Sequence, residues 1–147
     1  KAALEEAKNE LCIYIAVQTL EYLKKGGRVS PAVAAVGTLL NIKPILQLAT
    51  GKLQAFKKTR GMIKARETML EAIRSDLAIR FQEAQHRGDV HLLAAGSASP
   101  EETAKWLAQI EAAFPGMPVL YDDLSLGVSC HTGEGALGVG LSVRPRV

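Results

Sequence analysis

The sequence predicts an α/β or α+β fold, a mixed β-sheet with flanking helices, from three observations. Short β-branched runs of strand length alternate with longer stretches that have helical spacing of apolar residues. Two of the short runs are separated only by a tight glycine turn, which is typical of an antiparallel hairpin. The 147 residues, 48% of them hydrophobic and 22% charged, are enough for one domain with its own core.

The first quarter of the chain combines helix and strand signals. Residues 1–11 are rich in helix formers with leucine and alanine at helical spacing, which predicts one or two amphipathic turns. Residues 12–17 (CIYIAV) are β-branched and aromatic, which predicts a strand. Residues 19–25 favour a short helix, and Gly26 and Gly27 are expected to end it.

A second helix is expected directly afterwards. Ser30 is suited to cap a helix and Pro31 to occupy its first position. Residues 32–40 are apolar around nearly the whole circumference of that helix, and many of them are small. We therefore expect this helix either to pack closely on neighbouring backbones or to line an apolar cavity.

A hairpin and the longest helix follow. Pro44 interrupts the apolar pattern, and residues 45–48 and 53–56 predict two short strands joined by a turn at 50–52. Residues 62–85 carry apolar side chains at helical spacing with charged side chains on the other face. This segment predicts one long amphipathic helix.

The C-terminal half alternates between strands and a helix. Residues 90–95 predict a strand, and 99–114 predict a helix that opens with a Ser-Pro-Glu-Glu capping box. Residues 119–121 predict a short strand. A glycine-rich stretch at 133–140 is expected to form a turn that leads into a final strand at 141–143.

Several classes of function are disfavoured by the sequence. The net charge of +3 comes without a dense basic block and only 5% of residues are aromatic, so no nucleic-acid partner is expected. No run approaches the ~20 apolar residues of a membrane-spanning helix. Two cysteines and no leader predict a cytoplasmic protein. The chain begins with Lys1 inside a helical pattern, from which we expect an excised domain.

Residues 133–138 match the letters of the GxGxxG dinucleotide motif. The residues after them predict a strand rather than the helix that this motif requires, so no nucleotide cofactor is expected. The three histidines lack metal-ligand spacing, so no metal is expected either. A hydrolytic triad of Ser125 or Ser129 with His131 and Asp122 would lack a nucleophile elbow.

Two arginines and one histidine are candidates for binding an acid group. Arg28 and Arg60 each precede an expected helix N-terminus, where free N–H groups and the helix dipole favour an anion. His131 borders the glycine turn and, with the Thr132 hydroxyl, can hold a carboxylate or phosphate. Beside an apolar helix, these residues indicate an amphiphilic ligand, although surface or ion-pair roles for both arginines remain open.

Three ordered segments resemble motifs of the DegV family. Residues 19–30 (TLEYLKKGGRVS) resemble its "LxYLxxGGRIS" signature, 40–46 (LNIKPIL) its "LNIKPIL" segment, and 131–138 (HTGEGALG) its "HTGPGALG" motif. Residues 58–61 resemble the start of the family's "RxRxKA" region. Glu134 replaces the usual proline, and its carboxylate can raise the proton affinity of the nearby histidine or change the turn.

The resemblance implies a bacterial fatty-acid-binding protein rather than an enzyme. Residues 1–147 would form its C-terminal lipid-binding domain, and the N-terminal domain of the same polypeptide would be missing. Such a carrier encloses a long-chain fatty acid and presents its carboxylate to a separate fatty acid kinase catalytic subunit. The acid-group end would comprise Arg28, Arg60, His131, Thr132 and Gly133. The wall of the acyl pocket would comprise Ala32, Ala35, Val36, Leu39 and Leu40.

Two alternatives belong to other functional classes. The first is a small-molecule phosphotransferase-like enzyme that uses His131 as base or nucleophile. The second is a ligand-free oligomerisation or regulatory domain, which predicts a stable homodimer of the fragment.

Overall fold

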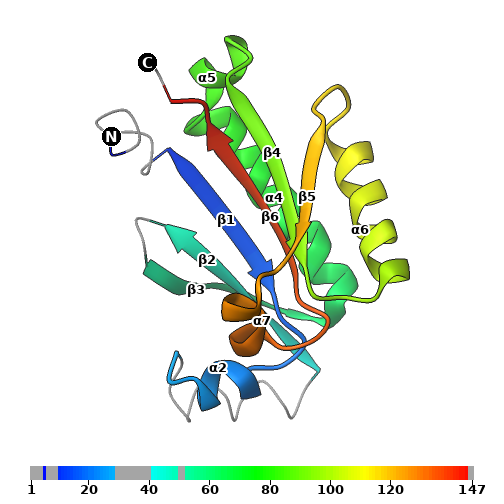
Figure 1. Cartoon of the computed structure of the whole chain (residues 1–147). Coiled ribbons are helices and arrows are strands. Elements are labelled where there is room, and N and C mark those ends of the chain that lie inside the picture. The colour runs from blue at the N-terminus through cyan, green and yellow to red at the C-terminus, as the bar shows by residue number, and fades with distance from the viewer. Residues whose placement is uncertain (1–4, 6–9, 29–40, 50–51, 146–147) are drawn as a thin grey trace.

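The computed structural model describes residues 5, 10–28, 41–49 and 52–145. Its strands and helices, labelled as in Figure 1, are β1 (Leu11–Ala16), α2 (Glu21–Lys25), β2 (Ile42–Ala49), β3 (Lys52–Arg60), α4 (Gly61–Ile79), α5 (Gln82–His86), β4 (Val90–Gly96), α6 (Pro100–Ala113), β5 (Val119–Asp123), α7 (Leu126–Thr132) and β6 (Leu137–Val143). No helix in these described ranges has both the length and the apolar character needed to cross a bilayer.

The six strands form one mixed sheet in the order β3-β2-β1-β6-β4-β5 (Figure 1). Only the β4–β5 pair is parallel, and every other neighbouring pair is antiparallel. The sequence prediction of a mixed sheet with flanking helices is therefore confirmed. The predicted hairpin is also confirmed as β2 and β3, with a register irregularity at Ile45 and Leu46.

One face of the sheet is covered by α4, α5 and α6, and it holds the main core (Figure 1). Its largest fully buried side chains include Trp106, Met69, Ile73, Leu92 and Ile110. These side chains come from α4, α6 and β4, so the core packs the helical layer against the sheet. The predicted cap of α6 is confirmed, because the Ser99 side chain accepts a hydrogen bond from the backbone N–H of Glu102 at 3.3 Å.

Among the elements that the structure describes, α2 and α7 alone cover the opposite face, and they do so at one end (Figure 1). A smaller cluster of buried residues lies there, made by Ile15, Val17, Leu20, Leu23, Leu46 and Ala136. Farther along the strands, no element in the described ranges packs on this face. We call it the open face.

The structure corrects the predicted long helix over 62–85. It is two helices, because the backbone leaves the helical path at Phe81 (φ −115°, ψ 12°) before α5 begins. The N–H groups of Arg80 and Phe81 both donate to the Asp76 carbonyl, at 2.8 and 2.9 Å. The Phe81 side chain lies in the core, with 5% of the residue exposed.

One further expectation at the C-terminal end was wrong. The final strand begins at Leu137 rather than Leu141, so Gly138 and Gly140 are strand residues paired with β1 and β4. The segment before the glycine turn is helical, as α7, where no element had been expected. The helix expected at 32–40 lies outside the described residues, as does most of the segment 1–9.

Candidate ligand-binding site

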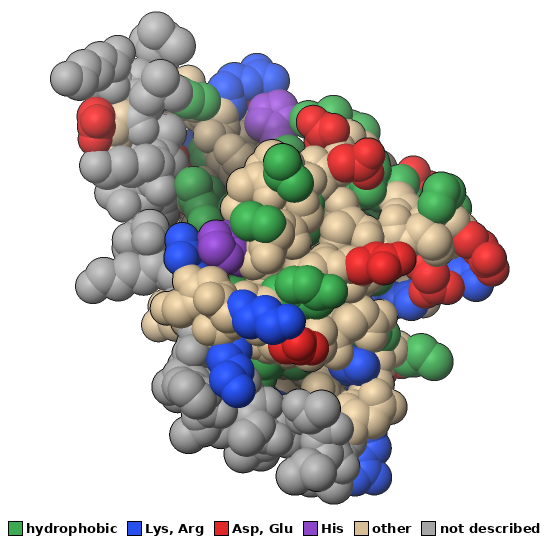
Figure 2. Space-filling view, turned by 60° about the horizontal axis from the view of Figure 1, so that its bottom comes forward, with side chains coloured by type: hydrophobic (Ala, Val, Ile, Leu, Met, Phe, Trp, Pro, Cys, Tyr) green, Lys and Arg blue, Asp and Glu red, His purple; other side chains and the backbone are tan. Residues whose placement is uncertain are grey.

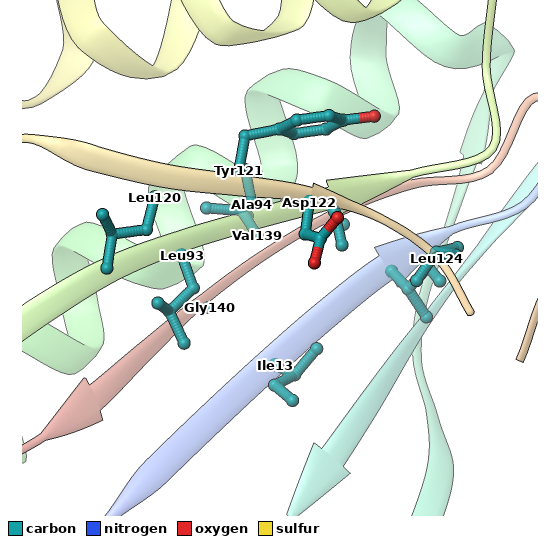
Figure 3. Close-up of a pocket in the computed structure, with 12 residues that line it drawn as sticks. Ile13, Leu93, Ala94, Leu120, Tyr121, Asp122, Leu124, Val139 and Gly140 are labelled. Carbon is teal, nitrogen blue, oxygen red and sulfur yellow. The ribbon is translucent and has the colours of Figure 1, made fainter.

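The open face is hollowed at its centre. The hollow has a volume of about 470 Å³, and its walls are almost entirely apolar. Figure 3 shows Ile13, Leu93 and Leu120 bordering it from three different strands, with Leu124 at one end. Asp122 is the one charged residue among those that line it. A hollow of this kind is suited to an apolar ligand rather than to a polar substrate.

The hollow exists because β6 carries glycine where its neighbours carry side chains. Gly138 lies between Ile15 of β1 and Ala95 of β4, and Gly140 lies between Ile13 and Leu93. With no side chain on β6 at these two positions, a trough runs over its backbone between β1 and β4. We use the word trough for this groove over Gly138 and Gly140.

Gly140 is also required by the close approach of β1. A Cβ atom placed at this position would lie 2.6 Å from the Cys12 carbonyl oxygen, which is closer than such atoms approach in folded proteins. A strand glycine often marks a place where another backbone or a ligand comes near. At Gly140 the neighbouring backbone alone accounts for the glycine, and the empty groove above it is the result.

At the covered end of the open face, α2 and α7 fit together through their glycines. A Cβ at Gly26 would overlap the imidazole of His131, and one at Gly133 would overlap the ring of Tyr22. Gly133 also has a φ of +77°, a backbone conformation that favours glycine. The His131 ring is therefore held against the end of α2. We call this place the α2–α7 junction.

Ser97 fastens the turn that follows α7, a role that sequence reasoning missed. Its hydroxyl donates to the Gly133 carbonyl at 2.6 Å and accepts from the Ala136 N–H at 3.1 Å. The Ser97 carbonyl accepts from the Gly135 N–H at 2.9 Å. Nothing in the sequence indicates this role, because it depends on a contact between residues nearly forty positions apart.

The structure brings four of the predicted acid-group residues together at the α2–α7 junction. Arg28 is exposed, and its guanidinium donates to the Gly26 carbonyl at 2.5 Å. His131 is partly buried in the last turn of α7, which directly precedes the glycine turn, and is followed by Thr132 and Gly133. Thr132 is buried, and its hydroxyl donates to the Val128 carbonyl at 3.4 Å.

The other predicted site residues do not join this group in the described structure. Arg60 is exposed at the end of β3, where it immediately precedes α4, and no described contact links it to the junction. The five residues predicted to line the acyl pocket, Ala32, Ala35, Val36, Leu39 and Leu40, lie outside the described residues.

The surface around the α2–α7 junction is mixed in character. Figure 2, which brings this end of the molecule forward, shows hydrophobic side chains lying among basic and histidine side chains. Acidic side chains gather toward the side of the molecule where α6 lies. Tyr22, Leu126 and Val128 are the exposed large hydrophobic residues of α2 and α7. An anion at this end would meet positive charge and apolar surface together.

A buried polar cluster lies on the helix-covered face, away from the trough. The Tyr14 hydroxyl donates to the Asp76 carboxylate at 2.7 Å and accepts from the Gln47 amide at 3.0 Å, and Arg80 pairs with Asp76 at 3.2 Å. Burial, reinforced by Asp76, raises the pKa of the Cys12 thiol to about 12 and raises the pKa of Tyr14. Cys12 is therefore a protonated core residue and not a nucleophile.

The described residues contain no group of three or more histidine, cysteine or acidic side chains that could hold a metal ion. The open face offers apolar contacts along the trough and charged and polar groups at the α2–α7 junction. The fold and the trough together define an α/β domain with an apolar face that the described elements leave largely uncovered.

Comparison with known proteins identifies the family. A family model described as "Uncharacterised protein, DegV family" matches residues 1–144. A DegV domain-containing protein from Clostridium perfringens is 34% identical over 141 residues, which cover 92% of this chain and 45% of the relative. The chain belongs to the DegV family, and it spans about half the length of the curated relatives that it matches.

Solved structures show the same fold. A DegV family protein from Thermus thermophilus, described by its fatty acid binding, has 33% sequence identity and a TM-score of 0.74, over 97% of this chain and 49% of the other. DegV from Bacillus subtilis, described as a fatty acid binding protein, has 29% identity and a TM-score of 0.72, over 97% of this chain and 48% of the other.

Proposed function

We propose that this chain binds a long-chain fatty acid, with the hydrocarbon tail along the trough and the acid group at the α2–α7 junction. The observation that carries this proposal is the glycine-floored apolar trough on an otherwise open sheet face. The described fatty-acid binding of the Thermus thermophilus and Bacillus subtilis relatives supports it.

Binding in the trough would be driven by removal of the tail from water. Each buried methylene contributes about 0.8 kcal/mol, so a tail needs apolar contact along much of its length to bind well. Ile13 and Ile15 on one side and Leu93 and Ala95 on the other provide such contact. Because the trough is open above, a second wall would increase the buried area of the tail.

We propose that the second wall comes from the rest of the polypeptide. The matched relatives are about twice as long as this chain, which leaves them enough residues for another domain. In this arrangement the chain is the C-terminal domain of a two-domain carrier. The segment containing Ala32, Ala35, Val36, Leu39 and Leu40 would add to the wall of the acyl pocket.

At the junction, the acid group would be bound by positive charge and by hydrogen-bond donors. Arg28 offers a guanidinium suited to a carboxylate, and His131 offers a ring N–H held in place by the end of α2. Arg60 would approach from the start of α4. These groups lie at or near the surface, which supports our further proposal that the carboxylate is presented to a separate fatty acid kinase.

The decisive experiment analyses the lipid that the protein carries. The protein at its full natural length is purified under conditions that retain lipid, extracted with solvent and examined by mass spectrometry. We expect a long-chain fatty acid in the extract. We expect Ala95→Phe to remove most of it, because Ala95 of β4 lines the hollow beside Gly138 and a phenyl ring there would fill the trough.

Ala108→Phe is the matched control, because Ala108 is exposed on α6 and lies away from the open face. It should leave the fatty acid in place. Repeated extracts without any acyl chain would overturn the proposal. Phosphotransfer activity of the purified protein without a kinase, abolished by His131→Ala, would favour the enzymatic alternative instead.

A further inference from the structure

The open face becomes polar just beyond the trough, at the next residues that face the same side. The next positions on the same face are Leu11 of β1, Ser142 of β6 and His91 of β4, and Ser142 pairs with both of the others. Since side chains alternate along a strand, Ser142 and His91 lie on the face of Gly138 and Gly140. The glycine floor is therefore followed by a hydroxyl and an imidazole side by side.

These two polar side chains are partly exposed. Neither forms a hydrogen bond to another residue in the described part of the chain, and both are accessible to water. A hydrocarbon tail laid across them would remove that water and return no hydrogen bond. Burying a polar group without a partner is unfavourable, and it opposes the gain from burying further methylenes.

We propose that Ser142 and His91 form a polar stop that sets the longest fatty-acid tail this protein binds well. This inference rests on the proposed function and names the residues that decide its length preference. The tail gains affinity as it extends over Gly138 and Gly140, and it stops gaining where it would cover the imidazole and the hydroxyl.

The geometry makes the stop a sharp one. From Gly138 to Ser142 the strand advances four residues, roughly 13 Å, at about 3.3 Å per residue. Within that distance the lining changes from two glycines flanked by isoleucine, leucine and alanine to a serine beside a histidine. The tail therefore meets the stop after a fixed length, counted from the α2–α7 junction.

The experiment measures affinity against chain length with saturated fatty acids as probes. Laurate, myristate, palmitate, stearate and arachidate each displace a fluorescent fatty acid from the protein at its full natural length. Wild-type affinity should rise about fourfold for each added methylene and then level off or fall at the stop. His91→Leu, which replaces the imidazole with an apolar side chain, should move the levelling point to a longer acid.

A matched control comes from the chain itself. His86→Leu removes a histidine from α5, on the far side of the sheet, and should leave the length profile unchanged. Ser142→Ala is a second test that alters β6 very little. It removes only the hydroxyl, and it should improve binding of the acids beyond the wild-type levelling point by severalfold.

The outcomes separate this inference from the function on which it rests. If none of the acids displaces the fluorescent fatty acid from the wild-type protein, the fatty-acid function itself is overturned. A length profile that His91→Leu and Ser142→Ala both leave unchanged, in a protein that still binds fatty acid, would overturn the polar stop alone. An equal loss of affinity for every acid in His91→Leu would also overturn it, because that result assigns the acid group to His91.

Discussion

The two faces of the sheet are built from the same strands but carry opposite kinds of side chain. On β6, Leu137, Val139 and Leu141 point toward the helices and are fully buried, whereas Gly138 and Gly140 face the trough. Because side chains alternate along β6, its large apolar residues all lie on the covered face and its glycines on the open face. Most of the buried apolar surface is therefore on the covered face, and the trough on the open face can take a ligand.

This separation has a physical benefit. Large side chains that interdigitate across two layers resist change, because each neighbour loses contacts when one is altered. A trough lined by glycine backbone and a single layer of aliphatic side chains has fewer such contacts to lose. Substitutions on the open face should therefore change binding, and substitutions on the covered face should change stability.

The largest effect is expected at Trp106. Its ring is fully buried on the covered face, and its indole N–H donates to the Gly138 carbonyl at 3.1 Å. Trp106→Ala should lower the free energy of unfolding by about 3–5 kcal/mol, through the lost burial and the cavity left behind. Urea unfolding measures this change. Ile79→Ala, at a side chain that is 78% exposed, should stay within about 0.5 kcal/mol.

The next effect is a loss of stability at alkaline pH, which also arises on the covered face. Burial raises the pKa of Cys12 from 9.0 to about 12, so above pH 9.0 the unfolded chain releases this proton while the folded protein keeps it. The free energy of unfolding should fall by about 1.4 kcal/mol per pH unit until the folded thiol also ionises. The raised pKa of Tyr14 adds to this fall at higher pH.

Cys12→Val tests the origin of that slope. The substitution keeps an apolar, strand-favouring side chain and removes the ionisable thiol. Above pH 9.0 the free energy of unfolding should therefore fall less steeply with pH, by about 1.4 kcal/mol per pH unit. Urea unfolding at a series of pH values gives both slopes. Equal slopes in the two proteins would contradict the role of Cys12. Cys130, which is exposed on α7, provides a control when it is changed to serine.

Local sequence signals placed most of the elements correctly, because those signals act over a few residues. The Ser99 cap and the periodic apolar stripe behind it define α6 without any tertiary information. The break at Phe81 could not be predicted, since the helical spacing of apolar residues continues through it. The segment of α7 contains glycine, serine and β-branched residues, which disfavour a helix.

The candidate site, too, could be predicted only in part from the sequence. Sequence motifs indicated Arg28, His131, Thr132 and Gly133, and the structure places them at one junction. The trough could not be predicted, because it depends on the register that sets Gly138 and Gly140 between residues of two distant strands. The expectation that 133–140 is mainly a turn hid this arrangement.

The two glycines of the trough should differ from each other in their effect on stability. Gly140→Ala brings a Cβ against the Cys12 carbonyl and should cost about 1–3 kcal/mol of stability. At Gly138 the nearest atom to an added Cβ is the Ala95 carbonyl oxygen at 3.4 Å, an ordinary contact. Gly138→Ala should therefore cost less than about 1 kcal/mol.

For Gly138→Ala the main effect is expected on binding, since the added methyl raises the floor of the trough. Displacement of a fluorescent fatty acid should weaken, while the unfolding midpoint stays close to that of the wild type. Equal destabilisation by the two substitutions would mean that the open face contributes to folding as the covered face does. The contrast between the faces would then be lost.

A moderate loss of stability with a larger loss of binding is expected at Ser97. Ser97→Ala removes the hydroxyl that holds the Gly133 carbonyl and the Ala136 N–H, which should cost about 1–2 kcal/mol. The turn after α7 would be released, and the position of His131 against Gly26 with it. Fatty-acid displacement should therefore weaken more than the stability loss alone would cause. Ser129→Ala, which removes a hydrogen bond inside α7, should change neither property appreciably. If both serine variants behaved alike, the acid group would not depend on the Ser97 turn, and the junction would be held by the fit of α2 against α7 alone.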